Sequence, residues 1–208
     1  GDRTATRGHL EAGLRLARPL DADYIASIGS MMLAMLAAAE GQQEEAAALL
    51  HDVLPLSEAL GDRGAAAISC LALAQIAVTV GNTGEAAVYW RKTLVLAREL
   101  DSALYAAVCL VEIARQLSAE QRSERAVWLL GASDLLRQAV AQHQDFGARF
   151  QAAFRQALAA TQAALSAEAF AQAWAEGQAL SLDQATDLAL AALAPTPPDT
   201  NPANAAVS

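Results

Sequence analysis

The chain has 208 residues, 54% of them hydrophobic and 18% charged, enough to bury a substantial core in one elongated domain. Aromatic residues supply only 5%, and the abundance of alanine and leucine favours closely packed helices over sheets. A formal net charge of −9 disfavours direct binding to nucleic acids and to anionic membranes, because both require clustered Lys and Arg. No segment reaches the roughly 20 apolar residues of a membrane span, and we expect a soluble, cytoplasmic protein.

Small and large apolar residues recur at intervals of forty positions. Self-similarity at a period of about 20–50 residues predicts a solenoid, in which each unit covers the apolar face of its neighbour. The three recurring sets are Leu20, Leu60 and Leu100, then Ala34, Ala74 and Ala114, and then Ala46, Ala86 and Ala126.

Apolar periodicity predicts a series of helices in chain order. Residues 6–20 resemble the second helix of a unit whose first helix is missing, which indicates a fragment of a longer protein. Gly41 and Gly81 are placed to end first helices, and Asp62 and Asp101 to accept backbone N–H groups at helix starts. The expected pairs are 22–39 with 44–60, 65–80 with 84–100, and 102–117 with 122–140.

The forty-residue register ends near residue 141. A polar break at 142–145 precedes three further predicted helices at 146–165, 168–177 and 183–194. Terminal units of solenoids differ from the rest because they must cover the last apolar face, so we expect these helices to form a cap. The chain thus divides into helical repeats at 1–140, capping helices at 141–194 and a proline-rich, disordered tail or linker at 195–208.

The sequence shows no constellation of residues for catalysis. Cys70 and Cys109 fall on apolar helix faces and are predicted to be buried, inert thiols. His9, His51 and His143 lie in different units without a carboxylate or cysteine at ligand spacing, so no metal is predicted. No glycine-rich phosphate loop is present. We therefore expect a protein without enzymatic activity and without a cofactor.

The pattern of small and bulky positions resembles the tetratricopeptide repeat family over about residues 5–140. The alanines above match its small positions, and Leu50, Trp90 and Leu130 take the large position of its second helix. The resemblance implies an all-α, right-handed solenoid of antiparallel helix pairs, with capping helices at its C-terminal end.

In that family the first helices line a concave groove, which supplies candidate binding residues. Three methionines make this groove suitable for an amphipathic helix, because methionine adapts to irregular partners. Alternatively, the chain's own helices, a neighbouring protomer or missing repeats cover it, or it takes a small effector. The groove positions are Ile28, Met31, Met32, Met35, Ile68, Leu71, Gln75, Val108, Val111, Glu112 and Arg115.

Two segments near the C-terminal end are similar to bacterial LuxR-type and maltose-activator-like regulators. They are residues 125–137 and residues 170–185, the latter with Phe170, Trp174 and Gly177 at Phe-x-x-x-Trp-x-x-Gly spacing. Phe170 and Trp174 are predicted to hold their helix against the preceding one, while Gly177 and Leu182 end it and seat the next. The resemblance implies a signalling ATPase module before residue 1 and, in some members, a helix-turn-helix module after the tail.

These features together predict a non-catalytic interaction and regulatory region, acting as sensor or scaffold in a larger bacterial regulator. Its expected partner is an amphipathic helix of another protein, or the ATPase module of its own full-length chain. A self-association scaffold, giving a homo-oligomer, is the alternative, together with a solenoid that binds a small effector. Direct contact with nucleic acid or membrane is not expected for this segment.

Overall fold

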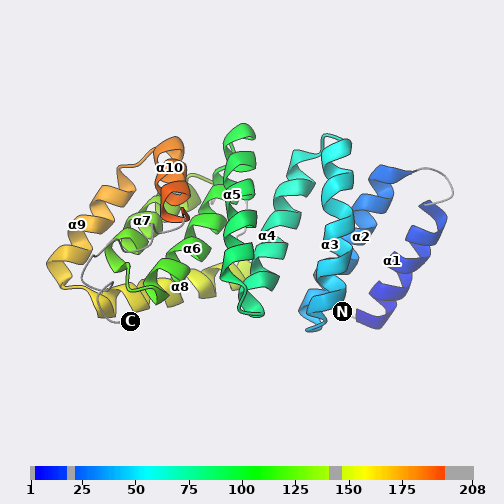
Figure 1. Ribbon diagram of the computed structural model, residues 1–208, viewed down its shortest axis with the longest axis horizontal. Helices are drawn as coiled ribbons and strands as arrows, with labels where there is room; N and C mark the ends of the chain where they lie inside the picture. The colour runs from blue at the N-terminus through cyan, green and yellow to red at the C-terminus, as the bar shows by residue number, and fades with distance from the viewer. Residues whose placement is uncertain (1–2, 18–21, 141–146, 195–208) are drawn as a thin grey trace, which may run out of the picture.

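The computed structural model describes residues 3–17, 22–140 and 147–194, and these form ten α-helices and no strand. Helices α1 to α7 follow one another along the long axis of the molecule, and α8 and α10 fold back against the last of them (Figure 1). The all-α prediction is thereby confirmed for the described ranges. The helices are α1 Arg3–Ala17, α2 Asp23–Ala39, α3 Gln43–Ala59, α4 Arg63–Thr79, α5 Thr83–Glu99, α6 Ala103–Ala119, α7 Ser123–Val140, α8 Gly147–Ala164, α9 Ala167–Gln178 and α10 Leu182–Ala192.

The forty-residue period of the sequence is present in the helix boundaries. Helices α2, α4 and α6 begin at Asp23, Arg63 and Ala103, and their partners α3, α5 and α7 each follow after the same short connection. Each helix from α1 to α8 packs against the next one, and α2 also contacts α4, as α4 contacts α6. Leu20, the polar break at 142–145 and the proline-rich tail lie outside the described residues.

The recurring alanines are fully buried between the packed helices. Ala34, Ala74 and Ala114 on the first helices of each pair are 0% exposed, as are Ala46, Ala86 and Ala126 on the second helices. Interiors pack densely, so a larger side chain at these contacts would force the helix axes apart. The repeated alanine therefore sets the spacing of the helix pairs.

The connections between the helices also repeat, with one left-handed residue every twenty positions. Gly41, Gly61 and Gly81 have φ angles of 82°, 70° and 81°, and Asp101 and Gln121 occupy the corresponding places with 47° and 62°. Glycine adopts this region without the steric cost that a Cβ atom brings. Each connection thus reverses the chain in two or three residues.

The two predicted aspartate caps have different outcomes. Asp62 accepts a hydrogen bond from the backbone N–H of Ala65 at 2.9 Å, as expected for a residue that begins a helix. The prediction for Asp101 is wrong, because this residue is the left-handed one of its turn. The cap belongs to Ser102, whose Oγ accepts from the N–H of Tyr105 at 3.4 Å.

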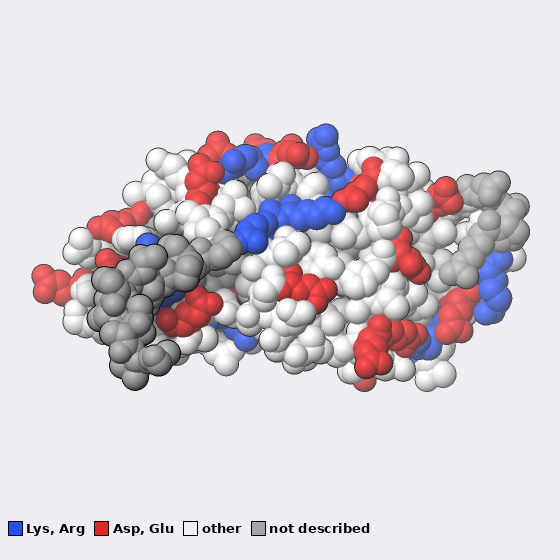
Figure 2. Space-filling model, viewed as in Figure 1, with Lys and Arg blue, Asp and Glu red and all other residues white. Residues whose placement is uncertain are grey.

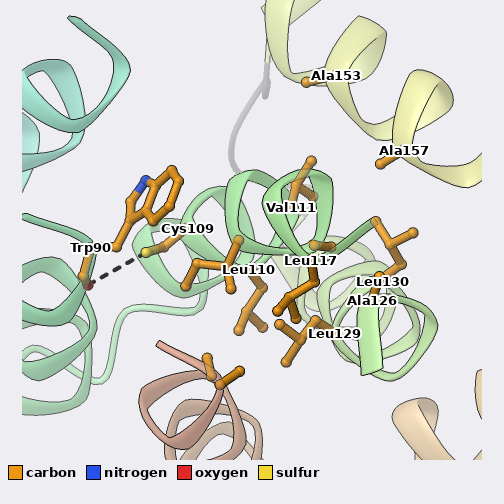
Figure 3. Close-up of a cluster of buried hydrophobic side chains, with 14 of the residues drawn as sticks. Trp90, Cys109, Leu110, Val111, Leu117, Ala126, Leu129, Leu130, Ala153 and Ala157 are labelled. Atoms are coloured by element: carbon orange, nitrogen blue, oxygen red, sulfur yellow. Dashed lines mark hydrogen bonds between the residues drawn. The ribbon is translucent and has the colours of Figure 1, made fainter. Parts of the chain in front are cut away.

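Helix α6 is packed against other helices on several sides. It packs against α7, and α8 and α10 also contact it. Figure 3 shows α8 and α10 on opposite sides of α6, with Val111 directed toward the α8 side, where Ala153 and Ala157 lie. Cys109 belongs to the same cluster, and its Sγ lies 3.6 Å from the carbonyl oxygen of Trp90.

Arginines hold α10 in place at its C-terminal end. Arg91 donates to the carbonyl oxygen of Leu193, and Arg122 donates to that of Ala192 at 3.0 Å. Cations at a helix C-terminus are favourable because the last carbonyl groups carry partial negative charge. Lys and Arg form a band over α5, toward α10, in Figure 2.

Helix α9 crosses α7 at two glycines with almost no space between the backbones. A Cβ atom on Gly131 would lie 2.6 Å from the carbonyl oxygen of Trp174, and one on Gly177 would lie 2.2 Å from that of Trp128. Gly177 lies in the last turn of α9, which ends one residue later than the sequence predicted. Its role is to let the two helices touch.

The aromatic pair of α9 does contact the preceding helix. The rings of Phe170 and Trp174 stack with centroids 5.7 Å apart, and Trp174 meets Phe154 of α8 edge-on at 6.4 Å. The larger contact of α9 is nevertheless with α7, where the indole Nε1 of Trp128 donates to Glu176 at 2.8 Å.

The glycine crossing makes a direct prediction about stability. Gly177→Ala should lower the free energy of unfolding by about 3 kcal/mol, because its methyl group would overlap a backbone oxygen that cannot turn away. The control is Gly13→Ala in α1, where no atom lies within 4 Å of the added Cβ. That change should raise stability by roughly 0.5–1 kcal/mol. If both substitutions changed the free energy of unfolding in urea by the same amount, the close backbone contact of α9 with α7 would be contradicted.

Candidate functional site

The predicted groove residues lie on three helices that differ in accessibility. On α2, Met32 and Met35 are 49% and 55% exposed, whereas Val111 on α6 is 0% exposed. The predicted positions on α4, namely Ile68, Leu71 and Gln75, are partly exposed. The predicted groove is therefore open along α2 and α4, and on α6 Val111 is buried while Val108, Glu112 and Arg115 are partly exposed.

The open part contains a cavity of about 180 Å³, which we call the α2–α4 hollow. Small residues of α2 form one side, α4 forms the other, and Leu50 of α3 closes the floor. Met35 and Gln75 are the two predicted groove residues that line it. The full lining is Ala34, Met35, Ala38, Ala39, Gln43, Leu50, Ala72, Gln75, Ile76 and Thr79.

A second cavity of about 490 Å³, the α4–α6 hollow, lies one unit further along the chain. Glu112 and Arg115, both predicted groove residues, line it and form an ion pair at 2.7 Å. Its lining comprises Val78, Trp90, Glu112, Arg115, Gln116, Ser118, Ala119, Gln121, Gln156, Ala157, Ala160 and Ala164.

The two hollows are the same structural feature in successive units. Six lining positions of the α2–α4 hollow reappear in the α4–α6 hollow after forty residues. Trp90 in the second hollow takes the position that Leu50 has in the first. The ion-paired Glu112 and Arg115 take the positions of the uncharged Ala72 and Gln75. The remaining correspondences are Ala38 with Val78, Ile76 with Gln116, and Thr79 with Ala119.

Helix α8 distinguishes the second hollow from the first. Its residues Ala157, Ala160 and Ala164 line the α4–α6 hollow, and Phe150 and Phe154 join the core around Val111. The sequence left open whether the chain's own helices cover the groove; on α6, Val111 is buried, whereas Val108, Glu112 and Arg115 remain partly exposed. Within the described residues, none of the cavities that α8 lines includes α2.

The alanines of α8 are a sequence signal that could have indicated its packing against the repeats. Ala153, Ala157, Ala160 and Ala164 recur at intervals of three and four, which places small side chains along one face of a helix. Trp90 was assigned to packing and not to the lining of a cavity.

The cysteines lie in the core and have raised pKa values. Burial raises the pKa of the Cys70 thiol to about 11 and that of the Cys109 thiol well above 9. A nucleophilic cysteine requires the opposite shift, toward the thiolate at neutral pH. Both thiols therefore act as small apolar groups.

The histidines are not brought together among the described residues. His9 is exposed, the Nε2 of His51 lies 2.9 Å from the hydroxyl oxygen of Tyr89, and His143 falls outside the described ranges. Residues 3–17, 22–140 and 147–194 contain no cluster of three potential metal ligands. Across the same ranges no helix is both long and apolar enough to cross a membrane.

Comparison with known proteins does not place the chain in a family. No protein-family model, no curated protein and no solved structure matches it.

The raised pKa of Cys70 predicts a dependence of stability on pH. The unfolded thiol ionises near pH 9 and the folded one near pH 11, so its contribution is complete below pH 9 and is lost as pH rises through 11. Between these values the wild type should lose about 2–3 kcal/mol more unfolding free energy than Cys70→Ala. Denaturant titrations at pH 8 to 11 measure this. If the unfolding free energies of the two proteins changed with pH in parallel, the burial of this thiol would be contradicted.

Proposed function

We propose that this chain is a non-catalytic protein-protein interaction and regulatory region of a larger bacterial signalling or transcriptional regulator. The forty-residue helix pairs and their buried alanines support a tetratricopeptide-like solenoid. The similarity of residues 125–137 and 170–185 to LuxR-type and maltose-activator-like regulators supports the wider context, with a cytoplasmic setting and with ATPase and DNA-binding activities in other parts of such a protein.

The observation that carries the proposal is the apolar, open α2–α4 hollow. All three methionines of the chain, Met31, Met32 and Met35, are on α2; Met32 and Met35 are about half exposed, and Met35 lines this cavity. Exposed methionine clusters are typical of surfaces that accept apolar segments of varied shape. A binding event there would control a regulator if its two states differ in affinity for the partner.

Self-association is the second candidate function, and a separate group of residues favours it. Leu16 of α1 and Tyr24 and Ile25 of α2 are 69%, 57% and 62% exposed. Large exposed apolar side chains that lie close together mark association surfaces. A symmetric contact through α1 and α2 would bury them.

Site-specific photo-crosslinking in cells of the source organism tests the proposal. A benzoylphenylalanine in place of Met35 should give a covalent adduct with another protein. The same group in place of Val88, an exposed residue of α5 outside the hollow, should not. Leu71→Glu on the facing helix should reduce the Met35 adduct at least fivefold, since it adds a charge to an apolar contact.

The mass of the adduct separates the two candidate functions. An adduct of twice the mass of the chain supports self-association, and any other mass identifies a partner for sequencing. The absence of an adduct at position 35, with efficient crosslinking to a chain neighbour as the positive control, would contradict the interaction function of the hollow.

A further inference from the structure

We propose that the α4–α6 hollow binds a small zwitterion of the α-amino acid class, held by the ion pair of Glu112 and Arg115. This site is separate from the α2–α4 hollow, to which the proposed function assigns a protein partner. An amino acid bound there would be a second ligand of the regulatory region. Three features of the hollow select it: the charges of its lining, the unused hydrogen-bonding capacity of the ion pair, and the apolar wall beside that pair.

The lining of the α4–α6 hollow carries one charge of each sign. Glu112 and Arg115 are its only charged residues, and its other polar residues are three glutamines and a serine. An anion or a cation alone would meet a like charge next to the opposite one, whereas a zwitterion offers an opposite charge to each. The lining therefore favours a ligand with both charges and no net charge.

The ion pair leaves part of its hydrogen-bonding capacity unused. Nη1 of Arg115 donates to Oε2 of Glu112 at 2.7 Å, and among the described residues neither Nη2 of this guanidinium nor Oε1 of this carboxylate has a partner. A guanidinium presents its N–H groups as a fork that fits a carboxylate, and a carboxylate oxygen accepts from an ammonium group. An α-amino acid carries both of these groups on one carbon atom, so both can reach an ion pair whose charges are adjacent.

A second ion pair at the same spacing, on α7, has its remaining capacity filled by the protein. Asp134 pairs with Arg137 and also accepts from Gln138 at 2.6 Å and from Gln178 at 3.5 Å. The guanidinium of Arg137 lies 5.5 Å from the centroid of the Phe154 ring. That pair thus connects α7 to α8 and α9. The pair on α6 bonds only within its own helix, so it has no comparable part in helix packing.

The preceding unit shows that the helix pair forms without these charges. The residues forty positions earlier are Ala72 and Gln75, on a helix of the same length as α6. The side chains of Glu112 and Arg115 are only 15% and 32% exposed. Taking charges partly out of water costs free energy, which their mutual attraction often regains only in part. A ligand that uses both charges accounts for their presence in this unit.

An apolar wall lies beside the charged pair. Val78 of α4, Trp90 of α5 and the alanines Ala157, Ala160 and Ala164 of α8 form it. The volume of about 490 Å³ is within the range of roughly 300–1,000 Å³ that is usual for small-ligand sites. The short alanine side chains leave room for a branched aliphatic group. An amino acid with such a side chain would place its charges on the ion pair and its apolar part on the wall.

L-leucine is the probe for this site, and the indole N–H signals of the complete, ¹⁵N-labelled 208-residue chain are the readout. Of the three tryptophans, Trp90 lines the hollow, and Trp128 and Trp174 do not. We expect a saturable shift of the Trp90 signal at millimolar L-leucine or below, and no shift of the other two. Isoamylamine lacks the carboxylate and 4-methylpentanoate lacks the ammonium group, so each should bind at least tenfold more weakly.

A double variant tests the ion pair without leaving an unpaired charge. Glu112→Ala with Arg115→Gln gives α6 the residues that α4 has at the equivalent positions, so the melting temperature should change little. L-leucine should bind this variant at least tenfold more weakly. The control is Arg63→Gln with Glu99→Gln, which removes an exposed ion pair between α4 and α5 outside the hollow and should leave binding unchanged. Arg115→Lys retains the charge without the fork and should also weaken binding.

Three results would overturn the proposal. They are the absence of a saturable shift of the Trp90 signal, equal binding of L-leucine and its two analogues, and unchanged binding by both the double variant and Arg115→Lys. The photo-crosslink at position 35 is measured separately in the other hollow. If it fails while L-leucine binds as expected, the proposed interaction function is wrong and the amino-acid site stands; the reverse pair of results removes only the amino-acid site.

Discussion

Close contact between helices at alanine and glycine is the constraint on which the structure depends. Ala34, Ala74 and Ala114 leave room for one helix of each pair to lie directly on the next, and Gly131 with Gly177 does the same for the cap. Dispersion and hydrophobic burial then act over many short contacts instead of a few large side chains. Such packing tolerates little enlargement at these positions, which explains why the small residues recur at a fixed interval.

The hollows follow from the same geometry. Where α2 lies beside α4, and α4 beside α6, small residues near the helix ends leave a cavity on one side of each contact. Helix α8 adds its alanines to the lining of the second cavity and extends the small-residue packing of the repeats. The first cavity has no lining residue from α8 and lies in the segment that also holds the three methionines and an excess of carboxylates.

The repeat was predictable from the sequence because its determinants are local and periodic. Alanine spacing and turn glycines place the six helices of the three pairs to within two residues at most of their boundaries. Asp101 was misassigned because a short polar residue suits both a helix cap and a left-handed turn, and only the backbone angle distinguishes them. The contact of α8 with α6 and that of Gly177 with Trp128 were not predicted. Both are between residues far apart in the chain, and such contacts leave no periodic pattern in the sequence.

The account places Met32 and Met35 on an accessible face of α2 and Trp90 inside the packed helix pairs, so the accessibility of these side chains is the decisive quantity. Hydroxyl-radical footprinting of the purified full chain measures it directly, since methionine sulfur and the tryptophan ring both react readily when solvent reaches them. The account predicts rapid oxidation of Met32 and Met35 and slow oxidation of Trp90, which is 2% exposed. Protected methionines, or a Trp90 that oxidises as fast as they do, would contradict it.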